Sequence, residues 1–264
     1  MTDTERISRR IRHELRFRLL QVKQVQQLRP RMLRVTLAGD ELEGFASAAH
    51  DDHVKLFFPE PGQLKPPLPV ATPEGMSFPN GRPQARDYTP RRYDAAAGEL
   101  DIDFALHEAG PATAWALQAK PGDWLGVGGP RGSFVLEKSF DWYLLAGDET
   151  ALPAIARRLE ELPAGARALV VAEVDEAAEE LDLHSAATLA LHWVHRGAGA
   201  SLREAVAALQ LPPGEGYAWV ACESDTARQL RQLLVEERGL PKNRVKAAGY
   251  WKRGAAATHE SHDD

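Results

Sequence analysis

Length, composition and charge exclude several classes of protein. The chain has 264 residues, which suggests about two domains, and its 44% hydrophobic and 27% charged residues are ordinary for a globular protein. Its net charge of −6 argues against general affinity for nucleic acid. No apolar run approaches the roughly 20 residues that cross a bilayer, and the charged N-terminus lacks the apolar core of a signal peptide. The single cysteine, Cys222, excludes an intramolecular disulfide and fits a reducing compartment. We therefore expect a cytoplasmic protein without membrane insertion, and a monomer is the simplest default.

The first half of the chain is predicted to consist of short strands with one late helix. Residues 100–106 alternate apolar and polar side chains, which is typical of a half-buried strand. Residues 59–84 are rich in proline and are expected to form a loop. Residues 111–117 predict a helix with proline in its first turn, where proline is tolerated. About six strands with one helix are typical of a small antiparallel barrel. The predicted strands are 15–25, 32–37, 53–58, 86–89, 100–106 and 124–127.

From about residue 138 the pattern changes to apolar strands that alternate with helices. Residues 142–146 are continuously apolar, as expected of a strand buried in a parallel sheet. Apolar residues at helical spacing follow as far as residue 162. Such alternation is typical of a parallel α/β sheet, in which ligands bind beyond the carboxyl ends of the strands. The other predicted elements are strands 168–174, 188–194, 217–221 and 245–248 and helices 201–209 and 224–238.

Residues 86–89 combine groups that suit a phosphate and an aromatic ring. Arg86 and Tyr88 share one face of a strand because side chains two positions apart point the same way. The guanidinium fork of arginine suits a phosphate, and the tyrosine ring offers a flat surface to another ring. Gly110 precedes the predicted helix, and the free amides at a helix N-terminus bind a pyrophosphate readily. This part of the chain therefore predicts a site for a flavin dinucleotide.

These residues resemble two known motifs. Residues 86–89 match the R-x-Y-[ST] flavin motif of the ferredoxin-reductase-like superfamily, and residues 110–113 are similar to its G-x-x-[ST] phosphate motif. Together with the Gly-Pro-Arg-Gly-Ser run at 129–133 and the Gly-Tyr-Trp-Lys-Arg-Gly run at 249–254, they resemble the siderophore-interacting proteins. Those proteins are FAD-containing ferric-siderophore reductases.

The resemblance, which covers roughly residues 15–254, implies two domains and the residues that bind FAD. It implies an antiparallel six-stranded FAD-binding β-barrel over residues 1–137, and an NAD(P)H-binding α/β parallel-sheet domain over residues 138–254. Residues 255–264 are expected to form a disordered tail. No catalytic acid–base pair and no protein metal ligands are expected, because the flavin carries the chemistry. The expected FAD residues are Arg86, Asp87, Tyr88, Thr89, Asp103, His107, Gly110, Pro111, Ala112, Thr113 and Trp115.

A second nucleotide site is expected at the carboxyl ends of the parallel strands. A Gly-Asp-Glu-Thr turn follows the first of these strands, where Asp148 or Thr150 is a candidate to cap the next helix. The G-x-G-x-x-G fingerprint is missing, and the resemblance identifies this turn as the siderophore-reductase version. Arg196 either binds the 2′-phosphate that distinguishes NADPH from NADH or is simply solvated. Cys222 is expected to be a buried apolar group rather than a redox thiol. The expected NADPH residues are Gly147, Asp148, Glu149, Thr150, Arg196 and Glu223.

The expected reaction is NADPH-dependent reduction of a ferric siderophore through FAD, with NADH as the other possible electron donor. Siderophores hold Fe(III) through hard oxygen donors, so reduction to Fe(II) weakens binding and releases the iron. A flavin accepts two electrons from a hydride and passes them on singly. Many ferric siderophores are anionic, so cations near the flavin aid encounter. The candidate cations are Lys55, Arg131, Lys252 and Arg253, each of which is otherwise an ordinary surface charge.

Two other functions fit the same sequence. A general NAD(P)H:flavin or ferredoxin-type electron-transfer oxidoreductase would share the fold and would reduce free flavin or a protein acceptor. A non-catalytic siderophore-binding protein would have lost its flavin and would be colourless. The presence of Arg86, Tyr88 and Gly110 argues against the second of these alternatives. Which siderophore is used is not specified by the sequence.

Overall fold

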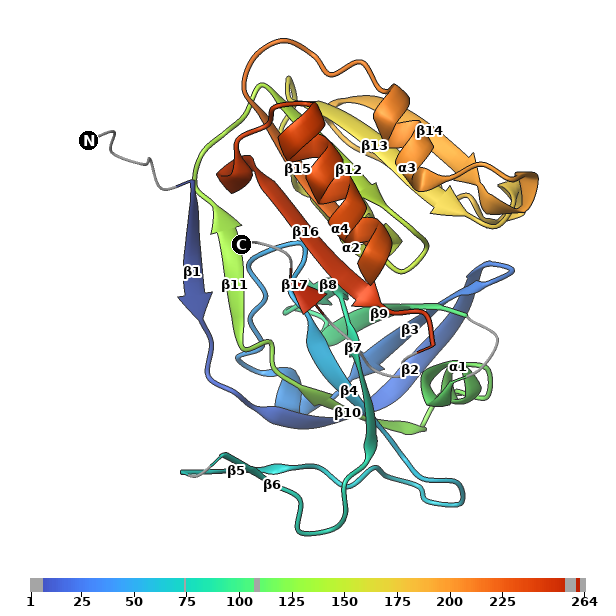
Figure 1. Cartoon of the computed structure of the whole chain (residues 1–264). Helices are drawn as coiled ribbons and strands as arrows, with labels where there is room; N and C mark the ends of the chain where they lie inside the picture. The colour runs from blue at the N-terminus through green and yellow to red at the C-terminus, as the bar shows by residue number, and fades with distance from the viewer. Residues whose placement is uncertain (1–6, 74, 107–109, 255–259, 262–264) are drawn as a thin grey trace. The chain divides into compact units, whose positions relative to one another are not determined.

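The computed structural model describes residues 7–73, 75–106, 110–254 and 260–261, which form two compact units (Figure 1). The first unit comprises Arg9–Val135, and the second comprises the described residues from Leu136 onward with Ile7 and Ser8. Each unit has its own hydrophobic core. Within the described residues, no helix is long and apolar enough to span a membrane.

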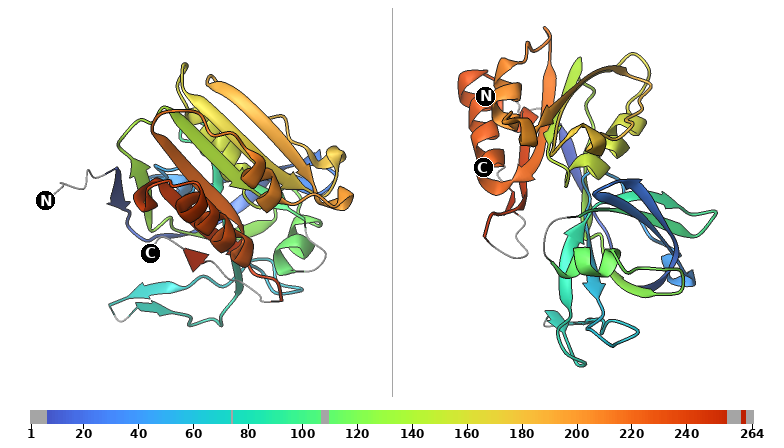
Figure 2. Two further views of the ribbon diagram at one scale, coloured as in Figure 1. Left: turned by 45° about the horizontal axis from the view of Figure 1, so that its top comes forward. Right: turned by 90° about the vertical axis from the view of Figure 1, so that its right-hand side faces the viewer.

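The first unit is built on a seven-stranded antiparallel sheet whose edge strands are consecutive in the chain. Its strands are β2 (Phe17–Arg29), β3 (Met32–Ala38), β4 (Val54–Phe58), β7 (Gln84–Tyr88), β8 (Pro90–Asp94), β9 (Glu99–Ala105) and β10 (Trp124–Gly128). They lie in the order β7-β4-β10-β2-β3-β9-β8. Only Thr89 separates β7 from β8, so one bent segment occupies both edges and the sheet curls toward a barrel (Figure 2). The antiparallel sheet confirms the predicted fold class, and its seven strands are close to the six that were expected.

Shorter elements complete the first unit. α1 (Pro111–Ala116) contacts β4, β7 and β9. A hairpin of β5 (Val70–Thr72) and β6 (Gly75–Ser77) lies inside the predicted loop 59–84. The remaining elements are β1 (Ser8–Arg12), β11 (Gly132–Leu136), which pairs with β1, and the 3₁₀ turn η1 (Asp40–Leu42). Strands of three residues carry too little periodicity to be predicted, which explains why the hairpin was missed.

The second unit contains a six-stranded sheet in the order β14-β13-β12-β15-β16-β17. Its strands are β12 (Trp142–Gly147), β13 (Arg167–Val174), β14 (Thr188–His195), β15 (Gly216–Glu223), β16 (Val245–Trp251) and β17 (Glu260–Ser261). The first five are parallel, as predicted, and β17 is antiparallel to β16. β17 belongs to the segment predicted to be a disordered tail, of which the other residues lie outside the described part.

Helices lie between most of the parallel strands (Figure 1). They are α2 (Leu152–Glu161), α3 (Leu202–Ala208) and α4 (Ser224–Gln232). The helix predicted over 224–238 changes after Gln232 into a π-helical turn, η4 (Leu233–Glu237). The short turns are η2 (Ala177–Glu179), η3 (Arg196–Ala198) and η5 (Lys242–Arg244). The strand order reverses between β12 and β15, and such a switch point is where parallel sheets bind ligands.

Gly147 allows β12 and β15 to approach closely at this switch point. A Cβ at this position would lie 2.4 Å from the Ala221 carbonyl oxygen and 2.4 Å from the Ala151 Cβ. Gly147→Ala is therefore expected to lower the free energy of unfolding by about 2 kcal/mol through overpacking. Urea unfolding measures this loss, with Gly110→Ala as a control, because a Cβ there meets nothing within 4 Å. Equal stability of the two variants would contradict the prediction.

Candidate functional site

The two flavin-motif segments meet through a cluster of aromatic rings in the first unit. The Tyr88 ring, at the end of β7, packs against Phe104 of β9 with a centroid distance of 4.6 Å. Trp115 of α1 packs against Phe104 at 5.7 Å and against Phe58 of β4 at 5.8 Å. Tyr88 is half-buried, and burial raises the pKa of its hydroxyl. These contacts hold α1 beside the end of β7, so the structure brings the two motifs together.

Arg86 and Gly110 offer the groups that a dinucleotide phosphate requires. Within the described residues, the Arg86 side chain donates one hydrogen bond, from Nη1 to the Ala85 carbonyl at 2.8 Å. Its other guanidinium hydrogens are available to an anion. Gly110 precedes α1 without a side-chain cap, and the amides of the first helical turn lack intrahelical partners. Thr89 is buried between β7 and β8, and predicted His107 lies outside the described residues. The residues present fit an FAD phosphate.

Asp87, a predicted FAD residue, and Lys55, a predicted siderophore cation, form an ion pair with each other. They are cross-strand neighbours on β7 and β4, and the Lys55 Nζ lies 2.6 Å from the Asp87 Oδ1. Asp87 points away from the face shared by Arg86 and Tyr88, because successive strand residues alternate. A predicted FAD residue and a predicted siderophore cation thus neutralise each other.

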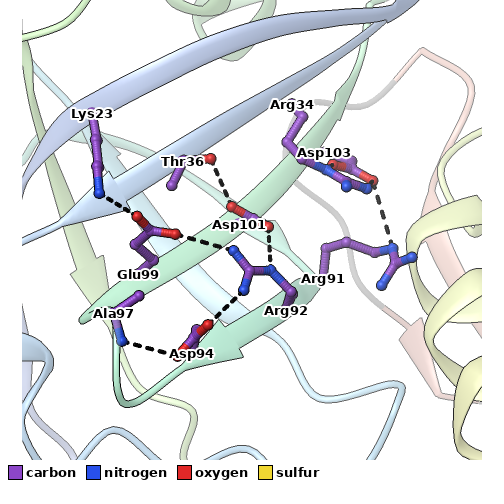
Figure 3. Close-up of polar contacts among 10 residues, drawn as sticks. All are labelled: Lys23, Arg34, Thr36, Arg91, Arg92, Asp94, Ala97, Glu99, Asp101 and Asp103. Carbon is purple, nitrogen blue, oxygen red and sulfur yellow. Dashed lines mark hydrogen bonds and ion pairs between the residues drawn. The ribbon is translucent and has the colours of Figure 1, made fainter.

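Asp103, another predicted FAD residue, is occupied by arginines. Its carboxylate accepts hydrogen bonds from Arg34 Nε at 2.7 Å and Nη2 at 2.8 Å, and Arg91 Nε lies 3.9 Å away (Figure 3). Only 1% of the Asp103 side chain is exposed. The polar face predicted for β9 is therefore covered by side chains of β3 and β8. Asp103 holds these arginines in place.

A second group of polar contacts surrounds Asp101, which lies two residues before Asp103 on the same face of β9. Asp101 accepts hydrogen bonds from Thr36 Oγ1 at 2.7 Å and Arg92 Nε at 2.8 Å. Arg92 also bridges to Asp94 and Glu99, and Lys23 pairs with Glu99 (Figure 3). These contacts tie β2, β3, β8 and β9 together on the outside of the barrel.

Asp148 is the centre of a buried hydrogen-bond network at the switch point of the second unit. Its Oδ1 accepts from Thr150 N at 3.0 Å and Thr150 Oγ1 at 2.5 Å. Its Oδ2 accepts from Trp251 Nε1 at 2.7 Å and Glu223 N at 3.2 Å. Burial, and then the Glu149 charge, raise the pKa of Asp148 to about 6, although these donors favour the carboxylate. Asp148 thus joins the ends of β12, β15 and β16.

The caps predicted at this turn are wrong. α2 begins at Leu152 after Ala151, and no side chain caps it. The Asp148 carboxylate instead accepts from the amide and hydroxyl of Thr150, which lies before the helix. An Asp side chain commonly bonds in this way to the residue two positions after it in a turn.

Glu223 closes the neighbouring strand end. Its Oε2 accepts from the Asp225 and Thr226 amides at 2.9 and 3.1 Å and thereby caps α4. Its Oε1 accepts from the Arg253 amide at 3.4 Å, which links this cap to the segment after β16. Cys222 is 1% exposed, and burial raises the pKa of its thiol, so the expectation of a buried apolar group is confirmed.

Arg196, after β14, is held by three carboxylates. Nη2 donates to both oxygens of Glu149 at 2.9 and 3.0 Å, Nη1 donates to Glu173 at 2.7 Å, and Nε contacts Asp175 at 3.4 Å. Simple solvation does not describe an arginine held by these contacts, and its role toward a 2′-phosphate stays a prediction. Glu173 and Asp175 were not among the predicted residues; their acidic side chains at the end of a strand were the available signal.

Of the other predicted cations, Arg131 and Arg253 are exposed and Lys252 is half-buried. The Arg131 Nη2 lies 3.7 Å from the Met76 sulfur, and this uncharged atom does not neutralise the guanidinium. Lys252 and Arg253 follow the last residue of β16. Among the described residues, no group of three or more His, Cys, Asp or Glu side chains is arranged to hold a metal ion.

Comparison with known proteins identifies the family. The model of the siderophore-interacting FAD-binding domain matches residues 21–134, and that of the siderophore-interacting protein matches residues 140–254. An Escherichia coli protein named NADPH-dependent ferric-chelate reductase is 38% identical over 95% of this chain and 99% of its own length. The chain belongs to the siderophore-interacting protein family.

Two further relatives are similar over most of the chain. The ferric vibriobactin reductase of Vibrio cholerae is 36% identical over 90% of each protein. A siderophore utilization protein from T. fusca, known as a crystal structure, has a TM-score of 0.87 and 41% identity, over 95% of this chain and 98% of that one. The FAD-binding match includes both flavin motifs, and the second match includes the Asp148 and Arg196 sites.

Proposed function

We propose that the chain is an NADPH-dependent ferric-siderophore reductase that passes electrons through FAD to Fe(III) and releases the iron as Fe(II). The observation that carries the proposal is the full-length similarity to ferric reductases in a chain whose two flavin motifs meet at one edge of the barrel. The single buried cysteine further supports a cytoplasmic location, where thiols stay reduced.

In the proposed enzyme, FAD supplies the conversion of a two-electron hydride into one-electron transfers. Arg86 binds the pyrophosphate through its free guanidinium hydrogens, and the amides of the first turn of α1 add further donors. Tyr88 offers its ring to the flavin and is held in place by Phe104. Asp103 acts through the arginines that it orients. The other proposed FAD residues are Asp87, Thr89, His107, Gly110, Pro111, Ala112, Thr113 and Trp115.

NADPH is assigned to the carboxyl ends of β12, β14 and β15. The Gly147 turn lies at the switch point of the sheet, where dinucleotides bind in parallel folds. Asp148 holds Glu223 and Trp251 there through its buried carboxylate. The proposed NADPH residues are Gly147, Asp148, Glu149, Thr150, Arg196 and Glu223.

The ferric siderophore is attracted by cations of both units. Asp87 neutralises Lys55, so Arg131 is the stronger candidate of the first unit. Lys252 and Arg253 are the candidates of the second. Such charges raise the rate of encounter with an anionic chelate, and salt screens the effect.

Steady-state assays with an Fe(II) trap test this proposal. The purified protein, with FAD and NADPH, is given ferric catecholate and ferric hydroxamate chelates, and free flavin is the competing acceptor. Faster turnover with at least one chelate than with free flavin is expected. Turnover with free flavin alone would favour a general flavin reductase, and a protein that takes up no FAD would favour siderophore binding without catalysis.

A further inference from the structure

The carboxylates around Arg196 give this strand edge an unusual charge for a phosphate site. One guanidinium faces three carboxylates, those of Glu149, Glu173 and Asp175, so the four side chains carry two net negative charges. Each of the three guanidinium nitrogens already contacts a carboxylate oxygen. These contacts use four of the five guanidinium N–H groups, so a 2′-phosphate that binds Arg196 through two of them must displace a carboxylate, and it approaches the others against their repulsion.

The carboxylates differ in how firmly they are fixed. The Glu173 side chain is 14% exposed, and its second oxygen accepts the Leu202 amide at the start of α3 at 2.8 Å. The side chains of Glu149 and Asp175 are 22% and 37% exposed. Both oxygens of Glu149 accept from Arg196 Nη2, at 2.9 and 3.0 Å, so Glu149 makes two of the four contacts of this guanidinium. Glu149 is thus the principal competitor for the guanidinium.

The position of Glu173 and Asp175 favours a ribose hydroxyl over a phosphate. They lie at the carboxyl end of β13, the strand next to β12 and second in chain order. In dinucleotide-binding sheets, an acidic residue about 20 residues after the phosphate turn accepts a hydrogen bond from the ribose 2′-hydroxyl, and an arginine accommodates the 2′-phosphate. In this protein the acidic residues and the arginine lie at the same end of the sheet, and they form ion pairs with each other.

We propose that Glu149, Glu173 and Asp175 are specificity-determining residues that compete with the 2′-phosphate of NADPH for Arg196 and so limit the preference of the enzyme for NADPH over NADH. The proposal rests on the proposed function of this edge as the nucleotide site. NADPH binding opens the carboxylate contacts of Arg196, whereas the 2′-hydroxyl of NADH leaves them closed.

Anaerobic bleaching of the protein-bound flavin by each nucleotide tests this specificity without any siderophore. Glu149→Gln is expected to raise the ratio of the NADPH to the NADH second-order rate constants about tenfold, because one negative charge beside the phosphate is lost. Asp175→Asn is expected to raise it less, since its contact with Arg196 is longer and more exposed. Any effect of Glu149→Gln on Asp148 applies to both nucleotides and cancels in the ratio.

Glu161→Gln is the matched control. Glu161 lies at the far end of α2 and pairs with Arg157, so this variant removes one negative charge from the same unit away from Arg196. The ratio is expected to stay at its wild-type value.

Ionic strength gives a second, independent readout in the unmodified protein. Repulsion between the carboxylates and the 2′-phosphate is screened by salt, so the NADPH to NADH ratio is expected to rise with salt. An arginine free to bind phosphate gives the opposite trend. A ratio that falls with salt, or that Glu149→Gln leaves unchanged, overturns the proposal while both nucleotides still bleach the flavin. Flavin that neither nucleotide bleaches in the wild-type protein overturns the proposed function as well.

Discussion

Replacement of Arg86 by alanine is expected to weaken FAD binding about a hundredfold, because a charge-assisted contact to the pyrophosphate is lost. The fold itself should tolerate the change, since the hydrogen bond of the side chain within the described residues goes to its own neighbour, Ala85. Arg86→Lys should bind FAD with intermediate affinity, because it keeps the charge but loses the planar fork. Titration of the apoprotein with FAD, followed by flavin fluorescence, measures these affinities.

Arg82→Ala is the control for Arg86→Ala. Arg82 lies in the preceding loop, where its guanidinium carbon lies 4.9 Å from the centroid of the Phe78 ring, and FAD affinity should stay unchanged. An Arg86→Ala protein that purifies with a full complement of flavin would show that the pyrophosphate lies elsewhere. Tyr88→Ala should also lower flavin occupancy, whereas Tyr88→Phe keeps the ring that packs on Phe104.

The second large effect is expected from Asp148→Asn, as a change in how stability depends on pH. The Asp148 pKa is raised from 3.8 to about 6 in the folded protein, by burial first and by Glu149 second. The folded protein therefore holds this proton more tightly than the unfolded chain does. The contribution of Asp148 to stability is fully present below about pH 4 and is lost as the pH rises through about 6. A shift of roughly two pKa units corresponds to about 3 kcal/mol.

Asparagine at position 148 has no ionisable side chain, so the Asp148→Asn protein does not lose this stability as the pH rises. The free energy of unfolding of the wild-type protein relative to Asp148→Asn is expected to fall by about 3 kcal/mol between pH 4 and pH 7.5. Urea unfolding at several pH values measures the difference, and Asp225→Asn, at an exposed carboxylate paired with Arg228, provides the control. A difference between wild type and Asp148→Asn that is independent of pH would mean that Asp148 keeps an ordinary pKa.

Most of the fold followed from periodicity, and the exceptions have local causes. The parallel strands β12 to β16 were predicted because each carries an apolar run bounded by turn residues. β8 was missed because Pro90 suggested the end of a strand. In the structure Pro90 begins a new strand on the opposite edge of the same sheet. Proline lacks an amide hydrogen and is suited to an edge or the first residue of a strand.

The candidate site was predictable in its positions but not in its pairings. Strand alternation placed Arg86 and Tyr88 on one face and Gly110 before a helix, and the structure agrees. The contacts of Arg196 join residues 21 to 47 positions apart. Sequence shows that such residues follow strands, but the direction of each side chain depends on the packed sheet. The buried network of Asp148 and Trp251 has the same origin, since 103 positions separate them.

An anaerobic titration of the FAD-loaded protein tests the proposed reaction most directly. One equivalent of NADPH is added first, and a ferric siderophore is added next in the presence of an Fe(II) trap. A ferric-siderophore reductase should lose its flavin absorbance with NADPH and regain it with the chelate, while about two Fe(II) appear per NADPH because a hydride carries two electrons. Flavin that is bleached by NADPH but is not reoxidised by any ferric siderophore would contradict the assignment.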